Sequence, residues 1–232
     1  QTFDPSKLVT HSAQRAPYQV DKNSDETSQY EMLEQLRLTR DDHSEIKELC
    51  DLCDLEFMST AFDQESMEYL IHELAVSRLK IGSGDLTNGP LILAAARSEL
   101  DILISTGMGN VFDIRTALDI VAYGYSSEGY PKCVEDYEGL SDNDEMRKTL
   151  KENVTLLQCT TEYPTSYSEV NIRTIPWMRK TFGLPIGFSG ATKSSNDSIN
   201  VLPLYHGMFS DFLTKFSPVQ PETGINGTFS NL

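Results

Sequence analysis

The feature that most constrains the fold of this chain is a repeated alternation of short apolar segments with longer segments of helical periodicity. The apolar segments predict strands at 55–60, 78–81, 101–105, 154–159 and 185–188. Helices are expected at 40–53, 63–74, 90–97, 113–123 and 170–182, the last broken or kinked by Pro176. Strands that alternate with helices pair in parallel through crossover helices, so the sequence predicts an α/β fold with a covered parallel sheet.

The number of βα units favours a (β/α)₈ TIM barrel, with a doubly wound open sheet as the alternative. The barrel is expected to be incomplete at its N-terminus and degenerate at its last strand, for which only the weak segment 211–217 is a candidate. We expect one domain over 1–217. Within it, the acidic stretch 124–144 reads as an inserted surface excursion, and 218–232 reads as an irregular tail.

Charge and composition exclude several classes of function. The 232 residues carry a formal net charge of −16, which disfavours nucleic acid as a partner. No apolar run approaches the roughly 20 residues of a membrane span, and four scattered cysteines indicate a reducing, cytoplasmic compartment. Cys50 and Cys53 are interpreted as two buried thiols on a helix face, and His43 as an exposed helix residue.

Each predicted strand ends in small or hydroxyl-bearing residues. These ends are Ser59-Thr60, Gly82-Ser83-Gly84-Asp85, Ser105-Thr106-Gly107, Thr160-Thr161-Glu162 and Ser189-Gly190. One such end alone is equally compatible with helix capping or turn formation. In a parallel barrel, however, the carboxyl ends of the strands meet on one face, where hydroxyl and backbone N–H groups can converge on one anion.

Taken together, these strand ends resemble the sialic acid synthase family, whose enzymes make N-acetylneuraminic, legionaminic and related nonulosonic acids. The resemblance covers about 1–189 and includes Gln1-Thr2-Phe3, which is similar to the end of the family's second strand. It implies a (β/α)₈ barrel that condenses phosphoenolpyruvate with an N-acylmannosamine-type sugar and releases phosphate. It also implies that the first strand with its catalytic Glu, and a C-terminal antifreeze-like domain, lie outside this chain. A homodimer is expected for the full-length protein.

The resemblance also assigns candidate substrate-binding residues. Those similar to the family's phosphoenolpyruvate pocket are Thr60, Lys80, Ser83, Ser105, Thr161 and Ser189. Gln1 and Tyr163 are expected on the sugar side, with Ser24 or Asn23 near a further sugar contact. Lys80 would supply the one full positive charge of the pocket. The structural alternative is that Lys80 forms an ion pair with Asp85 or Glu162.

The sequence departs from the family at the metal site. The resemblance implies a divalent metal, Mn²⁺ or Mg²⁺, that polarises the sugar aldehyde. The family's two metal-ligating histidines correspond here to Ala191 and to Lys215, or to Thr214 if the alignment slips by one residue. Two hypotheses therefore remain: a phosphoenolpyruvate-dependent synthase, and a degenerate barrel or fragment that keeps an anion pocket without turnover. A sugar-phosphate aldolase is a third and weaker one.

Overall fold

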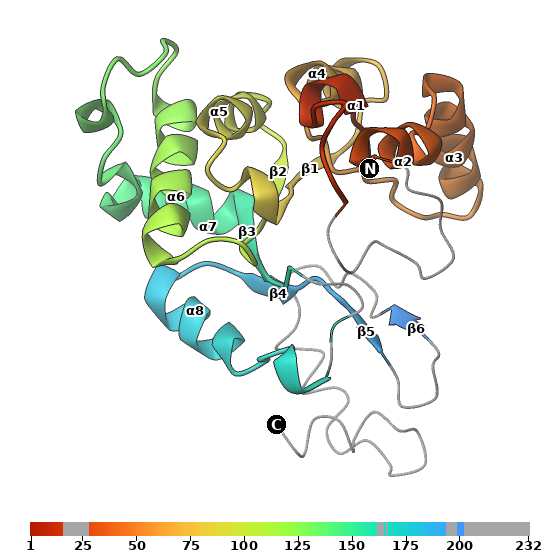
Figure 1. The fold of residues 1–232 in the computed structure, drawn as a ribbon. Helices are drawn as coiled ribbons and strands as arrows, with labels where there is room; N and C mark the ends of the chain where they lie inside the picture. The colour runs from red at the N-terminus through yellow and green to blue at the C-terminus, as the bar shows by residue number, and fades with distance from the viewer. Residues whose placement is uncertain (16–27, 162–164, 166, 194–198, 202–232) are drawn as a thin grey trace.

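The computed structural model describes residues 1–15, 28–161, 165, 167–193 and 199–201 (Figure 1). Its centre is a parallel sheet of four strands. In their order across the sheet, these are Arg78–Ile81 (β1), Asp101–Ser105 (β2), Val154–Gln158 (β3) and Ile186–Phe188 (β4). The expected α/β class with a parallel sheet is thereby confirmed.

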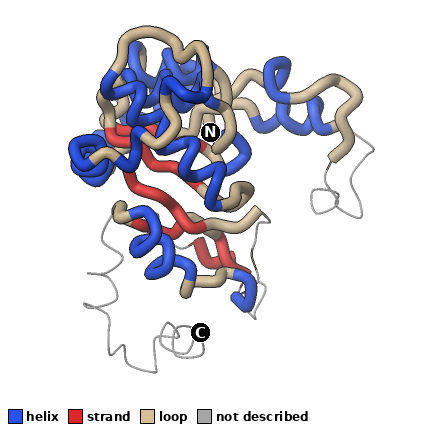
Figure 2. Tube along the Cα trace, turned by 90° about the vertical axis from the view of Figure 1, so that its left-hand side faces the viewer, coloured by secondary structure: helices blue, strands red, loops and turns tan. Residues whose placement is uncertain are grey.

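Two isolated parallel bridges continue the sheet beyond β1. Thr60 pairs with Lys80, and Ala61 pairs with Thr2. The spatial order of the described segments therefore follows their order in the sequence, without the reversal that a doubly wound sheet requires. Figure 2 shows the strands running side by side through the middle of the molecule. This order is that of a barrel wall, and closure of the wall into a barrel stays a prediction.

The expected strand at 55–60 is wrong for most of its length. Only Thr60, at its end, and the following Ala61 form bridges, Thr60 with Lys80 of β1 and Ala61 with Thr2. The segment that contains Thr2 cannot extend this pairing far, because residues 5–8 form a helix.

Eight α-helices connect and cover these strands in the described part of the chain. They are Pro5–Leu8 (α1), Gln29–Leu36 (α2), Arg40–Leu52 (α3), Gln64–His72 (α4), Gly89–Arg97 (α5), Val111–Ser126 (α6), Asp144–Asn153 (α7) and Thr174–Phe182 (α8). Figure 1 shows α5, α6 and α8 on the outer side of the sheet. Right-handed crossovers between consecutive neighbouring strands place all their helices on one face, which leaves the opposite face for a site.

Shorter elements complete the description. Four 3₁₀ turns lie at Ser83–Asp85 (η2), Val134–Asp136 (η3), Leu140–Asp142 (η4) and Tyr167–Glu169 (η5). Ala191–Lys193 (β5) and Ile199–Val201 (β6) form an antiparallel pair. No helix in the described part of the chain has the length and apolar character needed to cross a bilayer.

Local sequence signals fix several helix boundaries. The carboxylate of Asp63 accepts a hydrogen bond from the backbone N–H of Ser66 at 3.0 Å and starts α4, as its N-cap position predicts. Thr39 and Asp42 form a capping box at the start of α3. Pro176 does not break α8: it is the third residue of the helix, in the first turn, where a backbone N–H has no partner within the helix.

The core lies between the helices and one face of the sheet. The strand residues that point to the helices are almost fully buried: Leu79, Ile81, Ile102, Ile104, Val154, Leu156 and Ile186. Because successive side chains of a strand alternate between faces, the residues between them point to the other face. Lys80 is one of these.

The α3 region differs from expectation. Cys50 is half-buried, and Cys53 is exposed at the C-cap of α3, so the two do not form a buried thiol pair. Ile46 and Leu49, although helically spaced, are 38% and 59% exposed. His43, expected on the surface, is only 3% exposed.

The segment 124–144 has little regular structure. Helix α6 continues to Ser126, two 3₁₀ turns follow, and α7 begins at Asp144. The buried carboxylate of Asp119 accepts hydrogen bonds from the backbone N–H groups of Gly139 and Ser141, which fastens the end of this segment to α6. The proposed domain limits stay a prediction, and the tail 218–232 and the weak strand 211–217 lie outside the described residues.

Candidate functional site

Strand register brings hydroxyl groups and one lysine to the same face of the sheet. Lys80 pairs with Leu103, and Ser105 pairs with Leu157, so Lys80 and Ser105 point away from the helices at neighbouring positions. Leu157 in turn pairs with Gly187, two residues before Ser189. The alternation of side chains along the strands therefore predicts that Lys80 and Ser105 share one face of the sheet, with Ser189 just beyond the end of β4.

Lys80 and Ser189 meet directly although 109 positions separate them in the sequence. The ammonium of Lys80 donates a hydrogen bond to Ser189 Oγ at 3.2 Å. Ser189 is held in place by its backbone N–H, which donates to the carbonyl of Gln158 at 2.9 Å. The contact spans the sheet from β1 to the end of β4.

The environment of Lys80 disfavours its positive charge. Burial lowers the pKa of Lys80 from its usual value, and a weaker interaction with Cys159 acts in the opposite direction. The side chain forms no ion pair with a carboxylate of the described residues, Asp85 included, while Glu162 lies outside them. A partly buried ammonium without a counter-charge is suited to binding an anion.

Thr60 and Gln1 lie beside Lys80 on the first strands. The Thr60–Lys80 bridge places the two residues at the same level of the sheet. Gln1 directly precedes Thr2, which forms the bridge with Ala61. These observations place Gln1 at the edge of the same group of residues.

The turn after β1 carries Ser83. Residues Ser83–Asp85 form the 3₁₀ turn η2, and Ser83 is half-buried. A methyl group added at Gly82 would lie 3.2 Å from the ring of Phe62, so Phe62 from the neighbouring strand end covers this turn. Burial also raises the pKa of Asp85, while a hydrogen bond from Asn88 partly offsets that effect.

The ends of β2 and β3 pack closely against each other. Ser105 is 4% exposed, and among the described residues no hydrogen-bond partner for its hydroxyl is found. Gly107 donates its backbone N–H to Cys159 Sγ at 3.1 Å. A side chain at Gly107 would lie 2.9 Å from both the carbonyl oxygen and the sulfur of Cys159, so only glycine fits here.

The remaining candidates are not joined to this group. Thr161 follows β3 with an exposed side chain, and no contact with Lys80 or Ser189 is seen. Tyr163, Asn23 and Ser24 lie outside the described residues. The structure thus brings together Gln1, Thr60, Lys80, Ser105 and Ser189, with Ser83 on the adjoining turn.

The described residues do not fit a divalent metal. Among them, no three His, Cys, Asp or Glu side chains form a group that could hold an ion. Ala191 begins β5 and has no donor atom to offer, and Lys215 and Thr214 lie outside the described residues.

A buried polar network beside the site was not predicted from the sequence. His43 Nδ1 lies 2.8 Å from the carbonyl oxygen of Thr39, to which it donates, and Nε2 lies 2.8 Å from Thr2 Oγ1. Thr2 Oγ1 is also 2.7 Å from Ser59 Oγ. These contacts link α3 to Thr2 and Ser59, the residues just before Phe3 and Thr60. Because the partners are far apart in the sequence, no local pattern could reveal the network.

The fold and this site define a class: a parallel α/β protein of barrel-wall topology with a cation and hydroxyls at the carboxyl ends of its strands. Residues 1–204 match the model of the NeuB family. The chain therefore belongs to the NeuB family, the sialic acid synthase family that its sequence resembles.

Curated relatives agree with this assignment. The chain is 36% identical over 192 residues to N,N′-diacetyllegionaminic acid synthase of Legionella pneumophila, covering 83% of this chain and 48% of the relative. It is 32% identical over 204 residues to the enzyme of the same name from Campylobacter jejuni, covering 88% of this chain and 54% of the relative. The chain thus spans about half the length of these relatives.

Solved structures share the fold. The N-acetylneuraminic acid synthetase of Leptospira borgpetersenii, solved in complex with citrate, superposes with a TM-score of 0.58 at 21% identity, covering 83% of this chain and 53% of that one. A putative spore coat polysaccharide biosynthesis protein E of Chromobacterium violaceum gives a TM-score of 0.54 at 22% identity, covering 76% and 44%. At these identities the likeness concerns the fold alone.

Proposed function

We propose that this chain is the barrel part of a synthase that condenses phosphoenolpyruvate with an N-acylmannosamine-type sugar to give a nonulosonic acid and phosphate. The observation that carries the proposal is Lys80: a partly buried ammonium without an ion pair to a described carboxylate, hydrogen-bonded to Ser189 at the strand ends. Family membership supports the reaction class, and the names of the curated relatives support an acylated amino sugar as acceptor.

The residues of the site have distinct roles in this proposal. Lys80 pairs with the phosphate or carboxylate of phosphoenolpyruvate, and the hydroxyls of Thr60, Ser105 and Ser189 donate to the remaining oxygens. Neutral donors cost less to desolvate than further charges would, so one cation and several hydroxyls bind an anion without strong repulsion in the free protein. Ser83, on the turn after β1, adds a further hydroxyl. The family resemblance also assigns Thr161, although its side chain is exposed after β3.

The chemistry follows from holding phosphoenolpyruvate in this way. Carbon three of the enol attacks the open-chain aldehyde of the sugar and forms the new carbon–carbon bond. Water adds to the cationic carbon two, and the tetrahedral intermediate loses phosphate by cleavage of its carbon–oxygen bond. The family resemblance assigns Gln1 and Tyr163 to the sugar side. Hydrogen bonds to the phosphate oxygens stabilise the charge that develops as phosphate leaves.

The alternative to turnover is a degenerate barrel or fragment that keeps an anion-binding pocket. Ala191 and the absence of a metal-ligating group among the described residues suit a protein that binds phosphoenolpyruvate without turning it over.

Phosphate release tests the two candidates. The full-length protein is incubated with phosphoenolpyruvate and N-acetylmannosamine, with and without Mn²⁺, and inorganic phosphate is measured over time. The synthase proposal predicts release that needs both substrates. Release at the rate of buffer alone, together with measurable phosphoenolpyruvate binding, would refute turnover and support the second candidate; absence of binding would refute both.

A further inference from the structure

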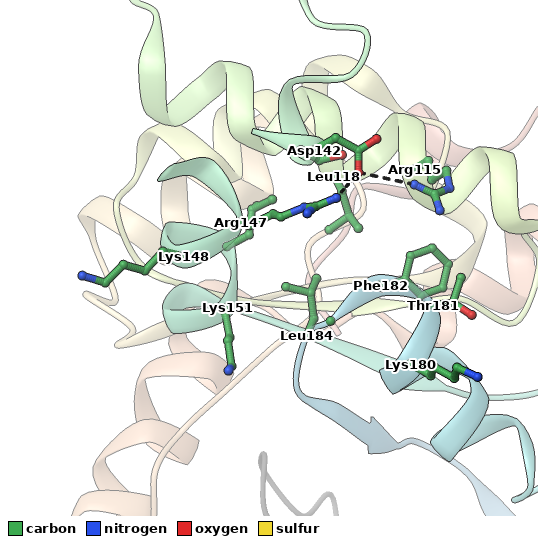
Figure 3. Close-up of a pocket in the computed structure, with 13 residues that line it drawn as sticks. Arg115, Leu118, Asp142, Arg147, Lys148, Lys151, Lys180, Thr181, Phe182 and Leu184 are labelled. Atoms are coloured by element: carbon green, nitrogen blue, oxygen red, sulfur yellow. Dashed lines mark hydrogen bonds and ion pairs between the residues drawn. The ribbon is translucent and has the colours of Figure 1, made fainter. Parts of the chain in front are cut away.

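A cavity lies on the helical side of the molecule, and Lys80 is not among its lining residues. It encloses about 510 Å³ between α6, α7 and the end of α8 (Figure 3). Its lining is strongly biased in charge, with five basic residues and one acidic residue: Arg115, Arg147, Lys148, Lys151, Lys180 and Asp142. In a chain of net charge −16, such a concentration of positive charge around one hollow is unexpected for a solvated surface.

The two arginines are held in place by one carboxylate. Asp142 accepts from Arg147 at 2.9 Å and lies 3.8 Å from Arg115, as the dashed lines in Figure 3 show. Asp142 closes the turn η4, which Asp119 fastens to α6 through the backbone N–H groups of Gly139 and Ser141. The buried Asp119 on α6 thus holds the turn that carries Asp142, and Asp142 in turn contacts both arginines.

The floor of the cavity is apolar and rigid. Leu118 and Leu184 are each 4% exposed, and Leu150 is 1% exposed. The guanidinium of Arg115 lies 5.9 Å from the centre of the Phe182 ring, which forms one wall. The three lysines come from the rim, where Figure 3 shows their side chains extending into solvent.

We infer that this cavity binds a small molecule of the diphosphate class. Five cations line the cavity, and two carboxylates oppose them: Asp142, and Asp144 at 4.0 Å from Arg147. The net positive lining favours an anion, and guanidinium groups bind phosphate oxygens in pairs. The volume of about 510 Å³ lies within the range of small-molecule sites. This inference does not depend on the proposed reaction at Lys80.

Calorimetric titration with inorganic pyrophosphate at fixed ionic strength tests the inference. The double variant Lys148→Gln/Lys151→Gln keeps both contacts of Asp142 and should weaken binding roughly tenfold or more through the loss of two rim charges. Arg115→Gln/Arg147→Gln should weaken it further. Arg179→Gln removes a charge from the exposed side of α8 outside the cavity and should leave the affinity within about twofold.

The variant Lys80→Met separates this site from the proposed phosphoenolpyruvate pocket. Binding of pyrophosphate that survives Lys80→Met and falls in the cavity variants supports the inference. Binding that Lys80→Met abolishes would assign the ion to the strand-end site and overturn it. Equal losses in Arg179→Gln and in the cavity variants would show a general charge effect, and would overturn it as well.

Discussion

At the scale of single residues, the cost of burying Lys80 is the main feature of the site. An ammonium in a partly desolvated position, with no ion pair to a carboxylate of the described residues, destabilises the free protein, and a bound anion relieves that cost. Anion binding therefore explains a partly buried lysine at position 80 better than a contribution to the stability of the fold does.

The titration of Lys80 gives a direct prediction. Since burial lowers the pKa of Lys80 below the usual 10.5, the unfolded chain binds this proton more tightly than the folded chain. The free energy of unfolding should thus rise with pH through the window between the folded pKa of Lys80 and 10.5. A bound anion should raise the pKa, so phosphoenolpyruvate should be bound with uptake of a proton in that window.

The ¹³Cε resonance of Lys80, assigned by its loss in Lys80→Met, reports this titration by NMR. We expect a midpoint below that of the exposed lysines and a higher midpoint with phosphoenolpyruvate present. A midpoint equal to that of the exposed lysines in both conditions would contradict this account of the site.

His43 gives a second prediction. His43→Ala removes the partner of Thr2 Oγ1 and of the Thr39 carbonyl, so buried polar groups lose their hydrogen bonds. We expect a loss of about 2 kcal/mol in the free energy of unfolding, measured by urea denaturation. The exposed His72 is the control, for which alanine should cost less than about 0.5 kcal/mol. Similar small losses in both variants would mean that the network does not stabilise the fold.

At the scale of elements, the contact between the ends of β2 and β3 shapes the floor of the site. Gly107→Ala would place a methyl group 2.9 Å from the Cys159 carbonyl oxygen, which is backbone and cannot move away without shifting β3. We expect a loss of roughly 1–3 kcal/mol in stability.

Gly84 offers a matched control in the neighbouring turn. A methyl group there would have Met108 Sδ at 3.9 Å as its nearest neighbour, an ordinary contact. Gly84→Ala should therefore be close to neutral in thermal unfolding. If Gly107→Ala were equally neutral, the close approach of the two strand ends would not constrain the site.

The elements also show what the sequence could predict. Strands β1 and β2 begin and end where the apolar runs do, since a buried parallel strand has a continuous apolar signal. Strand 55–60 was wrong because pairing depends on a partner far away in the sequence. The buried position of His43 was missed for the same reason, as its partner Thr2 is 41 residues away.

At the scale of the whole molecule, the order of the strands decides where function can lie. Six segments in sequence order, from Thr2 to β4, bring their carboxyl ends to one edge, so residues as distant as Lys80 and Ser189 become neighbours. The hydroxyl-rich strand ends were predictable from the sequence because the topology follows from the βα alternation. The basic cavity between α6, α7 and α8 was not, because its lining comes from helix surfaces whose relative placement no local pattern encodes.

The central claim is that the strand ends hold phosphoenolpyruvate through Lys80, and calorimetric titration of phosphoenolpyruvate into the wild type and Lys80→Met tests it most directly. The account predicts that Lys80→Met weakens binding by about 1.5–3 kcal/mol, while the free energy of unfolding stays equal or rises because a buried charge is removed. Lys132→Met, at an exposed lysine of the 124–144 segment, should bind as the wild type does. Equal affinity of Lys80→Met and the wild type would contradict the account.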